Sequence, residues 1–125
     1  MRNNGYLIPR NTVSKGTAEF IDNTVREYCE RHKVQRTDGG LYGLKANEDG
    51  DIKIDTANED AERHVLTVAA RLFASGIHLK GSFTREEDGV NRTIYIDGET
   101  ALQNLINDPV YLRKRLAKLE KIQGK

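Results

Sequence analysis

Two stretches of the chain alternate apolar and polar residues on both sides of a polar turn, which is the pattern of a two-stranded β-hairpin. The longer stretch runs from Ile77 to Asp97, and a shorter version of it runs from Leu41 to Asp55. Both contain Glu-Asp-Gly at the turn and an Ile-x-Ile-Asp strand after it. This repeated pattern constrains the fold strongly, because each hairpin has one apolar side that another element must cover.

Helical patterns are expected before each hairpin and after the second one. The first helix begins with a cap at Ser14 or Thr17 and runs to about residue 33, with apolar residues at helical spacing. A capping box at residues 56–59 predicts the start of the second helix, and Gly76 its end. A third helix is expected from about Thr100, and Asp108-Pro109 predicts a fourth.

The predicted order is therefore α-β-β-α-β-β-α-α, and the predicted class is α+β. We expect the two hairpins to form one antiparallel four-stranded sheet with helices packed on one face. The order suggests a tandem αββ pseudo-repeat, although the match is short and Asp-Gly turns are common. With 125 residues the chain is expected to be a single domain. Its parts are an extended N-terminal arm (1–13, with an edge strand at 6–9 as the alternative), a body (14–107) and a C-terminal helix (108–125).

The cysteine count and the hydropathy indicate the compartment. Cys29 is the only cysteine, so an intrachain disulfide is excluded and a reducing environment is favoured. The sequence has no apolar run long enough to cross a membrane and no apolar core of a signal peptide near its start. We therefore expect a cytoplasmic protein without membrane contact.

Catalytic and metal-binding patterns are weak. Cys29 and His32 have a spacing that two metal ligands can use, but His64 and His78 are isolated and no second cysteine completes a site. Cys29 falls on an apolar helix stripe, where a thiol is a poor nucleophile. The acidic residues near positions 48–51 and 86–88 are explained by turn chemistry. With no glycine-rich phosphate motif either, we expect no catalytic residue, metal or cofactor.

The charge distribution is the clearest sign of a partner. Residues 108–125 contain six Lys/Arg and two acidic residues, a net charge of +4, whereas the remainder has fourteen and seventeen, a net charge of −3. On the predicted sheet, basic side chains and one tyrosine fall on the side away from the core. The candidate partner-binding residues are Arg113, Lys114, Arg115, Lys118, Lys121, Lys45, Lys53, His78, Lys80 and Tyr95.

Three functions fit these observations. The first is a small non-enzymatic binding protein, a regulator or inhibitor, whose partner is another protein. The second is a nucleic-acid-binding module that uses the basic helix and the Lys/Tyr face for DNA or RNA. The third is a small enzyme of unknown class. The apolar stripe of the last helix offers pairing with a second copy of the chain, an alternative to packing on its own domain; it consists of Leu112, Leu116 and Leu119.

Overall fold

The computed structural model describes residues 2–34, 43–57, 59–110 and 113. It confirms the α+β class. In chain order the elements are β1 (Arg2–Pro9), α1 (Lys15–Arg31), β2 (Gly43–Ala46), β3 (Ile52–Thr56), α2 (Ala61–Ala74), β4 (Leu79–Glu87), β5 (Val90–Asp97) and α3 (Gly98–Ile106).

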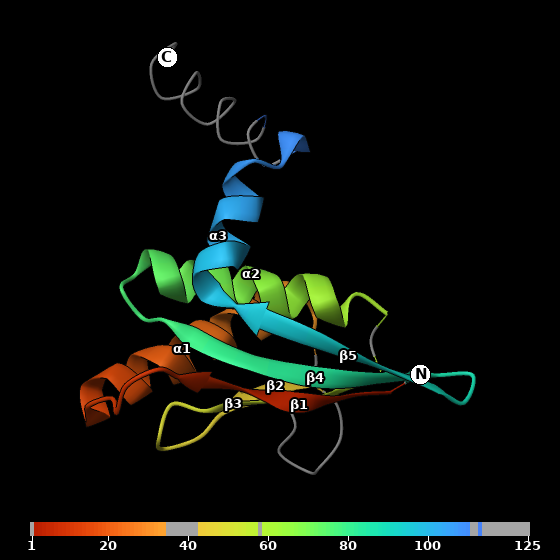
Figure 1. Ribbon diagram of the computed structural model, residues 1–125. Helices are drawn as coiled ribbons and strands as arrows, with labels where there is room; N and C mark the ends of the chain where they lie inside the picture. The colour runs from red at the N-terminus through yellow and green to blue at the C-terminus, as the bar shows by residue number, and fades with distance from the viewer. Residues whose placement is uncertain (1, 35–42, 58, 111–112, 114–125) are drawn as a thin grey trace.

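The five strands form one antiparallel sheet in the order β2-β3-β1-β4-β5. The described helices α1, α2 and α3 lie on one side of it, as Figure 1 shows, and most of the predicted fourth helix (108–125) lies outside the described residues. The sheet thus has five strands where four were predicted, and β1 lies between the two hairpins. The segment expected to be an N-terminal arm or edge strand is the central strand, and it pairs with one hairpin on each side.

β1 was hard to recognise as a central strand because its inner side chains are not β-branched. Asn3 is fully buried, and its Nδ2 donates a hydrogen bond to the carbonyl of Thr56 at 3.0 Å. Gly5 follows on the same face, and only Leu7 is a large apolar residue there. Asparagine and glycine are depleted in strands, so the sequence of β1 gives a weak strand signal despite its burial.

The two glycines at the centre of the sheet allow β1 and β4 to approach closely. A Cβ at Gly5 would overlap the carbonyl oxygen of Ser82, and one at Gly81 would overlap that of Tyr6. Any other residue at these positions must push the strands apart. Glycine in a strand interior often marks such a close backbone approach.

The remaining strands alternate as predicted. Ile94 and Ile96 on β5 are buried while Tyr95 between them is exposed, and Ile52 and Ile54 on β3 are buried as well. These inward residues form the core together with the apolar faces of α1 and α2. In addition, the buried Tyr28 hydroxyl on α1 lies 2.6 Å from Nδ1 of His64 on α2, and such a satisfied polar contact ties the two helices together.

The helix caps agree with the sequence only in part. The Ser14 hydroxyl accepts from the amide of Thr17 at 3.1 Å, as predicted. The capping box at 56–59 is wrong, because Thr56 is the buried last residue of β3 and α2 begins later, after Asp60. α3 starts at Gly98, with Asp97 as its N-cap. Among the helices described, none combines the length and the apolar character that a membrane span needs.

Candidate functional site

The side of the sheet opposite the helices, here called the open face, carries one row of side chains that crosses all five strands. The cross-strand registers pair Lys45 with Lys53, Lys53 with Tyr6, Tyr6 with Ser82, and Ser82 with Tyr95. Because side chains of directly paired residues lie on the same face, these five form a continuous line. We call it the Lys–Tyr row.

The open face exposes large apolar side chains. Tyr6 is 46% exposed and Tyr95 is 81% exposed, and they are separated by the small side chain of Ser82. Ile8, two residues from Tyr6 on the same strand, is 50% exposed. Neighbouring strands are about 4.8 Å apart, so the two tyrosine positions are about 10 Å apart across the row.

Two acidic residues on the open face have basic partners there. The Asp55 carboxylate lies 3.5 Å from the Arg2 guanidinium, and the Asp97 carboxylate lies 3.4 Å from the Lys80 ammonium. At the β2–β3 edge, two exposed lysines of the Lys–Tyr row are directly opposite each other. Lys53 is also the register partner of Tyr6, so a cation lies beside this tyrosine on the open face.

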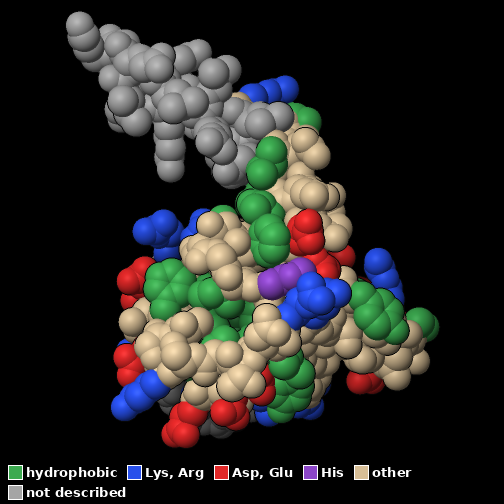
Figure 2. Space-filling view, turned by 60° about the vertical axis from the view of Figure 1, so that its left-hand side comes forward, with side chains coloured by type: hydrophobic (Ala, Val, Ile, Leu, Met, Phe, Trp, Pro, Cys, Tyr) green, Lys and Arg blue, Asp and Glu red, His purple; other side chains and the backbone are tan. Residues whose placement is uncertain are grey.

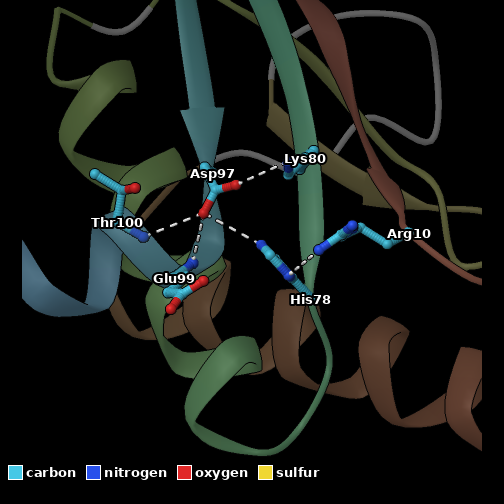
Figure 3. A network of polar contacts seen from close by, with 6 residues as sticks. All are labelled: Arg10, His78, Lys80, Asp97, Glu99 and Thr100. Carbon is cyan, nitrogen blue, oxygen red and sulfur yellow. Dashed lines mark hydrogen bonds and ion pairs between the residues drawn. The ribbon is translucent and has the colours of Figure 1, made fainter.

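A polar network closes one end of the open face (Figure 3). Nε2 of His78 lies 3.2 Å from Oδ1 of Asp97, and Nδ1 of His78 lies 3.5 Å from the Arg10 guanidinium. Since a guanidinium can only donate, Nδ1 accepts and Nε2 carries the proton that is donated to Asp97. In Figure 2 a histidine side chain is seen at the surface, between acidic and basic side chains and beside hydrophobic ones.

Asp97 caps α3 and anchors the same network. Its Oδ1 accepts from the backbone amides of Glu99 at 2.9 Å and Thr100 at 3.2 Å. Partial burial pushes the pKa of Asp97 upward, but the Thr100 amide, His78 and Lys80 outweigh that effect and hold the pKa below its usual value. The carboxylate is thus held ionised by contacts that also fix the start of the helix.

The group His78, Asp97 and Glu99 offers three metal-ligand atoms within 4.8 Å of one another. Both Asp97 oxygens already have partners, however: two amides and His78 on one, and Lys80 on the other. A cation would have to displace the Lys80 ammonium and approach the Arg10 guanidinium. The network is better explained as a helix cap joined to the edge of the open face.

A hollow of about 500 Å³ lies beside the network, between the start of α1 and the α2–β4 turn. Its described lining is mostly apolar and hydroxyl-bearing, including Val13, Thr17, Phe20 and Ile77. His78 is its only titratable lining residue. One histidine that is already bonded to a carboxylate and a guanidinium does not supply the acid–base pair that catalysis in such a hollow would use.

Of the ten residues predicted to bind a partner, the structure brings four together on the open face. Lys45, Lys53 and Tyr95 lie in the Lys–Tyr row, and Lys80 lies two residues before Ser82, on the same side of β4. His78 precedes β4 and belongs to the polar network. Arg113 is exposed, at a distance along the chain from these elements. The others lie outside the described residues: Lys114, Lys118, Lys121 and Arg115.

The sequence reasoning missed Tyr6, Ile8 and Arg10. Tyr6 and Ile8 belong to β1, which was expected to be an arm or an edge strand, so their place in the middle of a sheet face was not foreseen. The alternation of Asn4, Tyr6 and Ile8 with the inward-facing Asn3, Gly5 and Leu7 is the signal that could have found them. It is weak because three of the six are asparagine or glycine.

The residues considered for catalysis do not form one site. Cys29 is 2% exposed, with its thiol 3.9 Å from the Leu44 carbonyl, so it is a core residue. The ring of His32 stacks on that of Tyr28 with centroids 4.3 Å apart. The two acidic turns lie at opposite ends of the sheet, since Ile52 pairs with Leu7 whereas Glu86 pairs with Arg2.

Comparison of the chain with protein-family models, with curated proteins and with solved structures gave no match.

Proposed function

We propose that the protein is a non-enzymatic binding protein that contacts a macromolecular partner through the open face of its sheet. The observation that carries this proposal is the Lys–Tyr row, which crosses all five strands and exposes two tyrosines. The described helices lie on the other side of the sheet, so the row faces outward (Figure 1).

An uncovered sheet face normally carries polar side chains. Here Tyr6 and Ile8 on β1 and Tyr95 on β5 add large apolar surface. Contiguous apolar groups surrounded by polar ones are typical of interaction surfaces. Tyrosine suits such a surface well, because its ring supplies contact area while its hydroxyl tolerates water.

Contact rather than chemistry is the better account of this face. Three charged groups near it are engaged in holding the fold: Asp97 caps α3, and Asp55 and Lys80 are in ion pairs. A catalytic group must instead be available to a reacting atom. A regulator or inhibitor that acts by covering part of its partner needs no such group.

Site-specific photo-cross-linking tests the proposal directly. The full chain is produced in its own cells with p-benzoyl-phenylalanine at position 95 or at position 6, and adducts are separated after irradiation. The matched control carries the same group at position 20, because Phe20 on α1 is 45% exposed and Tyr6 is 46% exposed. We expect adducts from positions 95 and 6 and far fewer from position 20. Equal adducts from all three positions, or adducts from position 20 alone, would reject the open face as the contact surface.

A further inference from the structure

Resting on the proposed function, we infer that the partner is a single-stranded nucleic acid. Its bases stack on Tyr6 and Tyr95, and its phosphates contact Lys45 and Lys53. The composition of the Lys–Tyr row points to this partner: two adjacent lysines lie at one end, followed by two tyrosines with one small polar residue between them.

The aromatic part of the row fits unpaired bases. A base can stack on an exposed ring only when the face turned to the ring is not already stacked on a neighbouring base, and sheets that bind RNA present aromatic side chains to unstacked bases. Ser82 between Tyr6 and Tyr95 leaves the space above the middle of the row open to a ligand. A broad sheet face with exposed rings can support splayed bases.

The cationic part of the row fits phosphate. Lys45 and Lys53 are paired residues on adjacent antiparallel strands, and both are exposed. An anion placed above this pair is attracted by both side chains, as the phosphates of a nucleic acid are by lysines. Lys53 is also the register partner of Tyr6, which puts a cation directly beside the nearer ring.

The acidic residues of the open face do not oppose this placement. Asp55 is held by Arg2, and Asp97 is held by Lys80 and the α3 amides. Glu86 lies near the β4–β5 turn, at the far end of β4 from Lys80. An acidic protein would also be attracted to the lysine pair, but it has no bases that stack on the rings of both tyrosines.

Fluorescence anisotropy of labelled oligo(U) and oligo(dT) with the full chain tests the inference. Tyr6→Leu and Tyr95→Leu keep an apolar side chain but remove the ring, and each is expected to weaken binding about tenfold. Lys45→Gln and Lys53→Gln are each expected to reduce the slope of log K against log salt by about 0.7. Phe20→Leu and Lys15→Gln on α1 are the matched controls and should leave binding unchanged. Circular dichroism confirms that each variant is folded.

Two further measurements identify the site and the kind of nucleic acid. The same oligonucleotides annealed to their complements should bind more weakly, because stacked and paired bases cannot lie on the rings. A triple change of Arg113→Ala, Lys114→Ala and Arg115→Ala should leave the effect of Tyr95→Leu intact. Binding that is lost in this triple variant and unaffected by both tyrosine changes would overturn the inference.

The outcomes separate this inference from the proposed function. Heparin supplies anionic groups without bases. If heparin binds, if binding depends on Lys45 and Lys53, and if oligonucleotides gain nothing from Tyr6 and Tyr95, the inference fails while an anionic partner on the open face remains. Nuclease-resistant cross-links from position 95 to a protein would also reject the inference, while they would support a partner on the open face. If oligonucleotides do not bind and position 95 forms no cross-link, both the inference and the proposed function fail.

Discussion

Lys45 on β2 and Lys53 on β3 lie directly opposite each other in the antiparallel register of the sheet. Two like charges in this arrangement disfavour the pairing of the strands that carry them. β2 has only four residues and lies at the edge of the sheet, so its pairing with β3 is its one ladder. We expect these two adjacent lysines to contact the anionic partner proposed above.

Lys53→Glu should therefore stabilise the free protein and impair its binding. An opposite-charge pair in place of a like-charge pair is expected to raise the free energy of unfolding by about 0.5 kcal/mol. Urea denaturation followed by circular dichroism measures the first effect, and oligonucleotide anisotropy measures the second. Lys15→Glu, which changes the net charge equally on α1, is the control for an effect of total charge. A variant that is less stable and binds equally well would contradict the role assigned to the pair.

The Asp97 cap provides a second test, because its helix-capping and charge contributions can be separated. Asp97→Ala removes the acceptor of the Glu99 and Thr100 amides and should cost about 1 kcal/mol of stability. Asp97→Asn keeps an oxygen acceptor and should cost less, since asparagine is also a good N-cap. Thermal unfolding of the two variants measures the difference. Equal losses would show that the charge contacts with His78 and Lys80, and not the cap, determine the contribution.

The same carboxylate should contribute to acid sensitivity. Its folded pKa lies below the usual value of 3.8, so the folded state favours the ionised form. That contribution is fully present above the unfolded pKa and is lost as the pH falls through the folded pKa. Unfolding midpoints measured from about pH 5 downward should therefore fall less steeply in Asp97→Asn than in the parent protein. Parallel curves would contradict the assignment.

The sequence predicted the elements in which polarity alternates and failed where it does not. The hairpins follow from Leu44, Ile52, Ile54, Ile94 and Ile96, which are buried at every second position. β1 was missed because its inward positions begin with Asn3 and Gly5. Asn3 donates a hydrogen bond to Thr56, and Gly5 allows a close approach to β4, so both act on partners far along the chain. No local pattern contains that information.

The candidate site was limited by the same error. Lys45, Lys53 and Tyr95 were chosen from alternation within the hairpins, and the structure places them in one row. Tyr6, which joins the two halves of that row, belongs to the strand that was missed. Cross-strand register depends on which strands are neighbours, so the row could not be assembled until β1 was placed between β3 and β4.

Gly81 should be intolerant of any side chain. Gly81→Ala places a Cβ against the Tyr6 carbonyl, so β1 and β4 must separate at the centre of the sheet, and we expect a loss of about 2 to 4 kcal/mol. Gly16→Ala is the matched control, because nothing lies within 4 Å of its Cβ and alanine favours the helix. It should raise stability by about 0.5 kcal/mol. Urea unfolding of both variants tests the pair, and a Gly81→Ala protein of unchanged stability would contradict the close approach.

The contact between Tyr28 and His64 predicts how stability changes near neutral pH. Burial, with Arg63 as the next cause, lowers the pKa of His64 below 6.5, so the folded state resists a proton that the unfolded chain accepts. The free energy of unfolding should therefore fall as the pH drops below about 6.5, by at most about 1.4 kcal/mol per pH unit for this group. His64→Gln should flatten that dependence in urea unfolding at several pH values.

Tyr28→Phe, which removes the hydroxyl 2.6 Å from Nδ1 but keeps the imidazole, should cost about 1 kcal/mol of stability and leave the sign of the slope unchanged. His32→Gln serves as the control, because the pKa of this exposed histidine is also lowered. If the pH dependence disappears in His32→Gln and persists in His64→Gln, the titrating group is His32 and the prediction for His64 is wrong.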